Sequence, residues 1–272
     1  MRSLSEYIIE KFAAPNNGDE FYTRLKDIEK CCQDFNFSGK VIYCNCDDPS
    51  FSNFWKYFHD NFSKLRLKKL MATYYSDDPY LYEYDGKDIN KTKIDSGRFQ
   101  DNEKYLDKCD FVVSNPPYSG NMPLEYIKLL LKHNVDFLFV GPTHLIKKKE
   151  FFDLYKNGKV YSCLHYVHKF ERPGGGKDQN APTTWWTSIK QDKPDLKFEK
   201  EYSEDKYNKY ENYDAIDCTP YTEIPKDYDG LIGIPYTSIY KLSERQFKLI
   251  DILNVPILND KKIMSRLIIK FT

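Results

Sequence analysis

A short apolar run that ends in two prolines constrains the fold of this chain more than any other feature. The residues from Phe111 to Val113 have the pattern of a buried strand, Asn115-Pro116-Pro117-Tyr118 follow almost at once, and a helical pattern includes Leu124 and Ile127. Proline cannot donate a backbone hydrogen bond, and the residue before a proline avoids helical geometry. The segment therefore predicts a strand, a turn and a helix, which is the repeating unit of α/β folds.

Other segments extend this pattern in both directions. Strands are expected at 41–44, 67–75, 110–114 and 135–140, and helices at 25–34 and 52–62. This order predicts right-handed crossovers and a parallel sheet. Beyond Gly141 the periodicity weakens, and the expected elements are a strand-like run at 183–187, a helix at 244–253 and a closing hairpin that turns at Asn259-Asp260.

The charge of the chain excludes a global electrostatic attraction to nucleic acid. Its 41 basic and 41 acidic residues give a formal net charge of zero over 272 residues, so any nucleic-acid surface must be local. Residues 141–177 hold eight Lys or Arg against three acids, whereas residues 201–230 hold nine acids against three lysines. The first stretch could face phosphates and the second could face water.

Cysteine spacing and hydropathy exclude two further classes. The seven cysteines form no Cys-x-x-Cys pair and no ligand-spaced set with the five histidines, so no metal is expected. Their odd number and the lack of a signal peptide predict a reducing cytoplasm, with buried, reduced thiols. No apolar run approaches about 18 residues, so no membrane partner is expected.

The tetrapeptide has the groups that can activate an aromatic amine. The lone pair of such an amine, for example N6 of adenine, is delocalised into the ring, which makes the nitrogen a poor nucleophile. The side-chain oxygen of Asn115 and the backbone carbonyl of Pro116 can accept both N–H bonds, and Tyr118 can stack on the base. The alternative is that Asn-Pro-Pro is a turn after a strand and nothing more.

A methyl donor is the natural electrophile for such an amine, and two segments are candidates for its site. The carboxylates of Cys46-Asp47-Asp48-Pro49 could meet a ribose hydroxyl or the cationic end of S-adenosylmethionine, and Phe21-Tyr22-Thr23 could hold the cofactor tail. Phe99 could stack on the cofactor adenine. The alternatives are an N-cap pair for the acids and core packing for Phe99.

Two basic segments could contact a nucleic acid, one at its phosphates and one in a groove. The first is the run Lys147, Lys148 and Lys149, and the second is the glycine-rich loop between Arg172 and Lys177. A solvated helix face and a plain flexible loop are the respective alternatives.

Together these segments resemble the EcoRI-type adenine-specific DNA methyltransferase (modification methylase) family. The matching segments are 19–23, 41–58, 67–70 and 110–118, and the segments 137–141, 186–187 and 233–269 also look similar. The resemblance implies a bacterial or phage-encoded protein. It implies an α/β, class I S-adenosylmethionine-dependent methyltransferase fold, Rossmann-like with a mostly parallel sheet and an inserted target-recognition region. The implied organisation is a methyltransferase core over 1–164, a variable DNA target-recognition region over 165–230, and a C-terminal segment over 231–272 that packs on the core.

The resemblance also implies an activity and its residues. The implied reaction transfers methyl from S-adenosylmethionine to N6 of a flipped-out adenine in double-stranded DNA. By position, Asn115, Pro116, Pro117 and Tyr118 are catalytic, and Tyr22, Thr23, Asp47 and Asp48 contact the cofactor. Arg98 stands where the family tends to place an acid. Two alternatives stay open, namely methylation of RNA adenine or protein glutamine, and a catalytically silent DNA-binding protein.

Overall fold

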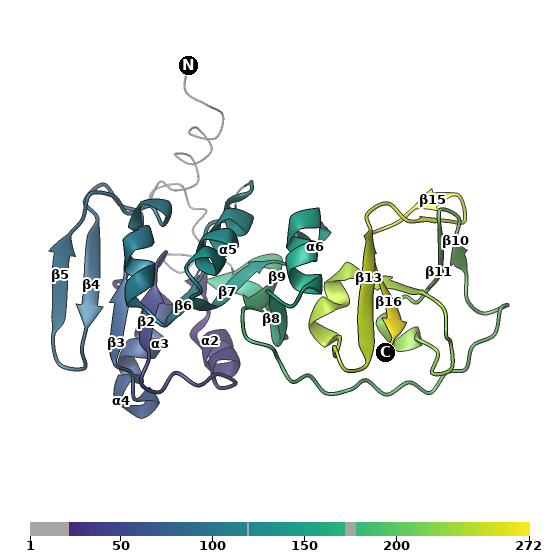
Figure 1. The fold of residues 1–272 in the computed structure, drawn as a ribbon, viewed down its shortest axis with the longest axis horizontal. Helices are drawn as coiled ribbons and strands as arrows, with labels where there is room; N and C mark the ends of the chain where they lie inside the picture. The colour runs from purple at the N-terminus through teal and green to yellow at the C-terminus, as the bar shows by residue number, and fades with distance from the viewer. Residues whose placement is uncertain (1–21, 119, 172–177) are drawn as a thin grey trace, which may run out of the picture. The chain divides into compact units, whose positions relative to one another are not determined.

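The protein forms two compact units, which are described one at a time. The computed structural model describes residues 22–118, 120–171 and 178–272 (Figure 1). The first unit contains the described residues up to Pro142 together with His165–Ile189, and the second contains Thr143–Leu164 with Lys190–Thr272.

A nine-stranded sheet forms the framework of the first unit (Figure 1), in the order β1-β8-β9-β7-β6-β2-β3-β4-β5. The strands are β1 Tyr22–Thr23, β2 Val41–Cys44, β3 Lys69–Ala72, β4 Tyr80–Tyr84, β5 Ile89–Lys93, β6 Phe111–Ser114, β7 Asp136–Pro142, β8 Tyr161–Glu171 and β9 Gln179–Thr187. β3, β2, β6 and β7 pair in parallel, whereas β1 with β8, β7 with β9, and β3, β4 and β5 among themselves pair antiparallel. The sheet is therefore mixed, and the expected parallel pairing holds for its four central strands.

Helices cover both faces of this sheet. They are α2 Leu25–Cys32, α3 Asn53–Asp60, α4 Phe62–Leu65, α5 Met122–Lys132 and the 3₁₀ segment η1 Gln100–Lys108. Trp185 and Trp186 are neighbours on β9 and so point to opposite faces. Trp185 contacts Phe54 of α3, whereas Phe139, the cross-strand partner of Trp186, contacts Tyr126 of α5. α3 and α5 thus lie on opposite faces, and the central strands are buried between them (Figure 1).

The sequence of α3 explains where this helix begins and which face it buries. The side chain of Ser52 accepts hydrogen bonds from the backbone N–H groups of Phe54 and Trp55, which are otherwise unpaired at a helix start. Phe54 and Phe58 lie one helical turn apart on the same side, and both are buried. The expected helix at 52–62 is therefore confirmed, with Ser52 rather than Asp47 or Asp48 as its cap.

A hairpin of β4 and β5 stands at one edge of the sheet and was not expected. Its turn is closed by Asp85, whose Oδ1 accepts hydrogen bonds from the N–H groups of Lys87 and Asp88. Gly86 has a φ of +98°, a conformation that glycine adopts without strain. The tyrosines of β4 alternate along the strand, which is the pattern of a half-buried strand.

The second unit is built on a five-stranded sheet in the order β10-β11-β12-β16-β13, with a separate two-stranded ribbon of β14 and β15. Its strands are β10 Lys209–Tyr210, β11 Tyr213–Asp217, β12 Ile232–Pro235, β13 Phe247–Leu253, β14 Ile257–Leu258, β15 Lys261–Lys262 and β16 Arg266–Phe271. Its helical segments are η2 Thr143–Lys147, α6 Lys149–Lys156, η3 Tyr221–Glu223 and η4 Tyr236–Lys241.

Two expectations for this unit need correction. The segment expected to be a helix at 244–253 contains β13, because its apolar residues pair with β16 along nearly the whole strand. The turn at Asn259-Asp260 is confirmed, with φ of +51° and +60° at the two residues, but it joins β14 to β15. β16 pairs with β12 and β13 instead of folding back on the residues after Val255.

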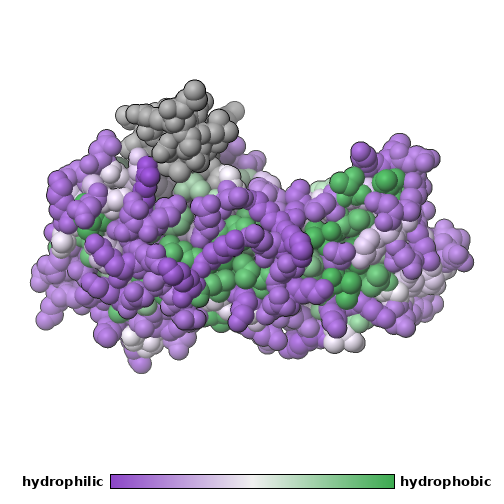
Figure 2. All heavy atoms as spheres, turned by 45° about the horizontal axis from the view of Figure 1, so that its top comes forward, coloured by the Kyte–Doolittle hydropathy of each residue, from purple (hydrophilic) through white to green (hydrophobic). Residues whose placement is uncertain are grey.

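Hydrophilic residues dominate the surface visible in Figure 2, and the cysteines form no disulfide. All seven cysteines are free, and five of them are buried. Within the described residues, no helix is long and apolar enough to cross a membrane, and no three His, Cys, Asp or Glu side chains cluster as a metal site would require.

A buried ion pair links the strands of the second unit. Arg266 Nε donates to Asp217 Oδ1 at 2.8 Å, and the Arg266 side chain is 6% exposed. The hydroxyl of Tyr210 donates to the same oxygen at 2.5 Å, and Arg266 Nη2 donates to Thr219 Oγ1 at 3.0 Å. The network connects β10, β11 and β16, so the loss of one member leaves a buried charge without its partner.

Arg266→Met should therefore destabilise the protein strongly. We expect the free energy of unfolding in urea to fall by about 3 to 5 kcal/mol, the usual cost of removing one partner of a buried ion pair. The double variant Arg266→Met/Asp217→Asn should recover part of that loss because it also removes the unpaired carboxylate. If the single variant lost less than about 1 kcal/mol of unfolding free energy, this pair would contribute no more than an exposed ion pair does, which would contradict the expectation.

Candidate active site

The tetrapeptide Asn115-Pro116-Pro117-Tyr118 begins where β6 ends. β6 is buried along its whole length and runs parallel to β2 and β7, so the loops after these strands leave from the same edge of the sheet. Pro116 is buried and Pro117 is exposed, while Asn115 and Tyr118 are half-buried. The two side chains with polar groups thus lie at the edge where ligands of α/β sheets bind.

A hydrogen bond within the tetrapeptide occupies the amide oxygen of Asn115. The hydroxyl of Tyr118 donates to Asn115 Oδ1 at 2.5 Å. Burial raises the pKa of Tyr118 well above its usual value, so the hydroxyl keeps its proton at neutral pH. Asn115 Oδ1, the oxygen expected to accept a hydrogen bond from an amine, therefore already accepts one from Tyr118.

The carboxylate of Asp47 joins the loop after β2 to the tetrapeptide. Asp47 is 6% exposed, and its Oδ2 accepts from Ser114 Oγ at 2.7 Å while its Oδ1 accepts from Ser52 Oγ at 2.8 Å. A backbone hydrogen bond from Asn115 also reaches this carboxylate. One side chain thus connects the loop after β2, the start of α3 and the residue that precedes Asn115.

Burial dominates the electrostatics of this carboxylate. Desolvation raises the pKa of Asp47 to about 6, although the hydrogen bonds from Ser114, Ser52 and Asn115 lower it. Burial also raises the pKa of the neighbouring Cys46 thiol, which therefore stays protonated at neutral pH. The half-buried carboxylate of Asp48 adds a smaller repulsion that raises the pKa of Asp47 further.

The two residues of β1 present a buried hydroxyl near α3. β1 pairs with β8, where Thr23 lies opposite Phe170 and Tyr22 opposite Glu171. Asn53 of α3 donates to the carbonyl of Thr23 at 2.9 Å. Thr23 is 2% exposed, and its Oγ1 has no hydrogen-bond partner among the described residues. A buried hydroxyl in this state fits a site that a polar ligand completes.

Asp48 forms the turn that leads into α3. Its Oδ1 accepts from the N–H of Ser50 at 2.8 Å, and its carbonyl accepts from the N–H of Ser52 at 2.7 Å. Phe51, three residues after Asp48, is 67% exposed. The loop therefore presents a half-buried acid and an exposed aromatic ring in front of the helix.

Phe99 lies in the core beside this edge of the sheet. It is 4% exposed, and its ring packs edge to face with Tyr126 at 5.1 Å. The hydroxyl of Tyr126 in turn donates to Asn45 Oδ1 in the loop after β2. A Cβ atom on Gly97 would lie 2.1 Å from the carbonyl oxygen of Tyr74, so the segment before η1 packs closely against the end of β3.

Most of the predicted site residues fall in the first unit, and Asp47 and Phe99 contact neighbours that sequence reasoning missed. The missed residues are Asn45, Ser52, Ser114 and Tyr126. Ser114 carries one signal in the sequence, because it is a hydroxyl residue inside an apolar strand and directly precedes Asn115. The others depend on contacts between segments far apart in the chain.

The predicted phosphate contacts fall elsewhere. Lys147 ends η2 and lies over the ring of Tyr236 at 5.2 Å, and the exposed Lys149 pairs with Asp153 at 2.8 Å within α6. Lys148 is half-buried at the start of α6. These three lysines belong to the second unit, and Arg172 and Lys177 lie outside the described residues.

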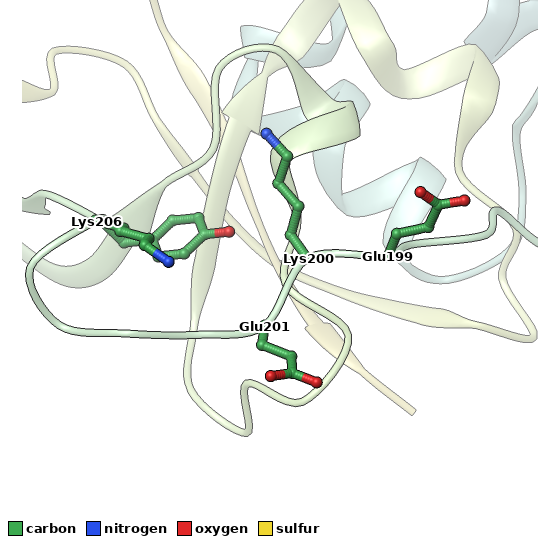
Figure 3. A pocket seen from close by; sticks show the side chains of 5 residues that line it. Glu199, Lys200, Glu201 and Lys206 are labelled. Carbon is green, nitrogen blue, oxygen red and sulfur yellow. The ribbon is translucent and has the colours of Figure 1, made fainter.

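A cavity of about 450 Å³ in the second unit does not contain any of these groups (Figure 3). Its lining consists of Glu199, Lys200, Glu201, Lys206 and Tyr207. Ion pairs with Glu223 and Lys226 already occupy Lys200 and Glu201. The chemistry that the tetrapeptide can perform therefore belongs to the first unit and not to this cavity.

Comparison with known proteins gives a family match over almost the whole chain. A family model described as adenine-specific methyltransferase EcoRI matches residues 10–88 and 82–270. The chain is 33% identical over 296 residues to the type II methyltransferase M.EcoRI of Escherichia coli, across 92% of this chain and 90% of that protein. It is 34% identical over 273 residues to the type II methyltransferase M.MpnI of Mycoplasma pneumoniae, across 89% and 84%. No solved structure matches the chain.

The raised pKa of Asp47 predicts a specific pH dependence of stability. Because the folded protein holds this proton more tightly than the unfolded chain, the contribution is largest below the unfolded pKa and is lost as pH rises through about 6. Between about pH 7 and pH 4.5, the wild-type protein should gain roughly 2 kcal/mol relative to Asp47→Asn. Urea unfolding at both pH values measures this difference, and an equal change in the two proteins would contradict the assignment.

Proposed function

The chain belongs to the EcoRI family of adenine-specific methyltransferases, and from this membership we propose that it transfers methyl from S-adenosylmethionine to N6 of an adenine in duplex DNA. The observation that supports the proposal most directly is the tetrapeptide at the carboxyl end of a buried parallel strand. The proposal places the chain in a type II restriction–modification setting, as the names of its relatives suggest.

The tetrapeptide activates the amine. Asn115 Oδ1 and the carbonyl oxygen of Pro116 accept the two N6 hydrogen bonds, which directs the nitrogen lone pair away from the ring and towards the methyl group. Pro117 continues the rigid turn, and Tyr118 stacks on a base that has left the duplex. The incoming amine replaces the Tyr118 hydroxyl as the donor to Asn115. The base thus enters a site whose acceptor is already oriented.

The residues of the loop after β2 and of β1 hold the cofactor. The buried Oγ1 of Thr23, which has no hydrogen-bond partner among the described residues, and the half-buried carboxylate of Asp48 fit the polar groups of S-adenosylmethionine. The cofactor supplies an electrophilic methyl on sulfur when bound. We assign the cofactor contacts to Tyr22, Thr23, Cys46, Asp47, Asp48 and Phe99. Both carboxylate oxygens of Asp47 already accept serine hydroxyls, so Asp47 orients this loop in addition to adding negative charge.

DNA contacts come from the basic stretch. We assign phosphate contacts to Lys147, Lys148, Lys149, Arg172 and Lys177, and target recognition to residues 165–230. Incorporation of tritiated methyl into unmethylated DNA tests the proposed function, with N6-methyladenine identified by mass spectrometry. A folded protein that binds S-adenosylmethionine but transfers no methyl to DNA would refute it.

Asn115→Ala should abolish methyl transfer while cofactor binding persists. Loss of one preorganised hydrogen-bond partner of the reacting group typically lowers the rate by about 10²- to 10³-fold. Calorimetric affinity for S-adenosylmethionine should stay within about 3-fold, because Asn115 faces the base in this account. Asn90→Ala, at an exposed position of β5, is the matched control and should keep full activity. Loss of cofactor affinity in Asn115→Ala would give Asn115 another role.

Variants of Tyr118 separate its hydroxyl from its ring. Tyr118→Phe keeps the stacking surface and removes a hydroxyl that the base displaces, so the transfer rate should stay within about 3-fold of wild type. Tyr118→Ala should raise KM for DNA by about 10- to 100-fold, in line with roughly 1 to 3 kcal/mol for one stacked base. Equal damage in the two variants would show that the hydroxyl, and not the ring, carries the function.

A further inference from the structure

Ser114 is the last residue of β6 and directly precedes Asn115, yet the proposed chemistry gives it no role. Its side chain is fully buried, and its Oγ donates to Asp47 Oδ2 at 2.7 Å. The same carboxylate receives a backbone hydrogen bond from Asn115. Ser114 and Asn115 are therefore both held by the carboxylate of Asp47, which lies on a different loop.

The hydrogen bond from Ser114 to Asp47 joins β6 to the loop after β2, beyond the last backbone pair between these two strands. The parallel register between β2 and β6 pairs Ile42 with Phe111 and Tyr43 with Val112. Ser114 lies two residues beyond the second pair, at the end of β6 and level with the loop that follows β2. A buried carboxylate with three donors supplies the cross-connection there, and the third donor, Ser52, fixes it to the start of α3.

We propose that Ser114 is a positioning residue for methyl transfer, which acts through its hydrogen bond to Asp47 to fix the backbone of Asn115. Asn115 and Pro116 present two acceptors to a single nitrogen, so a small rotation of the backbone before Asn115 moves both of them. A misplacement of about 1 Å can cost about 10²-fold in rate. The inference rests on the proposed function and adds a residue that does not touch the base or the cofactor.

The surroundings of Asp47 make the bridge sensitive to pH. The titratable groups that face it are Asp48, Cys46 and Cys44 from its own strand and loop, Tyr118 from the tetrapeptide and Tyr126 from α5. Burial raises the pKa of each of these thiols and phenols, so they are neutral when Asp47 titrates. Protonation of Asp47 turns one acceptor oxygen into a donor and weakens the bridge.

The chain offers a matched control for removal of this hydroxyl. Ser243 Oγ donates to Asp195 Oδ1 at 2.8 Å in the second unit, and Ser243 is 1% exposed. Ser243→Ala thus removes a serine–aspartate hydrogen bond from a buried serine that has no role in the proposed function. Ser114→Cys is a second test variant, because it nearly conserves shape while the thiol is a weak donor.

The experiment compares single-turnover methyl transfer to unmethylated DNA, with saturating DNA and tritiated S-adenosylmethionine, in the wild type and these three variants. Ser114→Ala and Ser114→Cys should lose about 10- to 100-fold in rate, while the calorimetric affinity for S-adenosylmethionine stays within about 3-fold. The acid limb of the pH–rate profile, which reports the titration of Asp47, should also move to higher pH in Ser114→Ala. The reason is that the hydrogen bond from Ser114 lowers the pKa of Asp47, so its loss raises that pKa. Ser243→Ala should change neither the rate nor the pH of the acid limb.

Three outcomes would overturn the inference. The first is a rate in folded Ser114→Ala or Ser114→Cys within about 3-fold of wild type. The second is an equal loss in Ser243→Ala, which would indicate general destabilisation. The third is an acid limb that stays fixed while the rate falls. If Ser114→Ala does not fold, Ser114→Cys decides. Failure of the proposed function is distinct, because the wild-type protein itself would then transfer no methyl to DNA.

Discussion

The buried carboxylate of Asp47 is the interaction on which the candidate site depends. Ser52 at the start of α3, Ser114 at the end of β6 and the backbone of Asn115 all donate to it. In a desolvated position each donor is needed, because a buried oxygen without its partner costs about 1 to 3 kcal/mol or more. Asp47 therefore fixes three segments relative to one another, namely the loop after β2, the first turn of α3 and the tetrapeptide.

This arrangement explains how a neutral loop can perform demanding chemistry. The amine needs two acceptors at fixed positions and a surface on which its ring can stack, and the tetrapeptide has all three within four residues. The Tyr118 hydroxyl keeps the Asn115 oxygen hydrogen-bonded before a base arrives. Family membership supplies the reaction class, and in the proposed mechanism Asn115 and Pro116 orient the reacting amine.

The spacing of apolar residues predicted those elements for which the pattern fits either a strand or a helix but not both. The buried strand Phe111–Ser114 and the helix capped by Ser52 were expected from apolar spacing alone. The segment around Phe247–Leu253 was expected to be a helix and is a strand, because pairing with β16 outweighed local preference. The link between Asp47 and Ser114 could not be predicted, since it joins residues 67 positions apart and depends on strand order.

We propose that Asn115 Oδ1 and the Pro116 carbonyl accept both hydrogens of the target N6. A crystal structure of the protein with duplex DNA and an unreactive cofactor analogue measures this directly. The adenine should be flipped out, with its N6 within about 3.2 Å of both oxygens. An adenine seated in the site with N6 bonded to neither oxygen, or with the Asn115 amide nitrogen facing it, would contradict this mechanism.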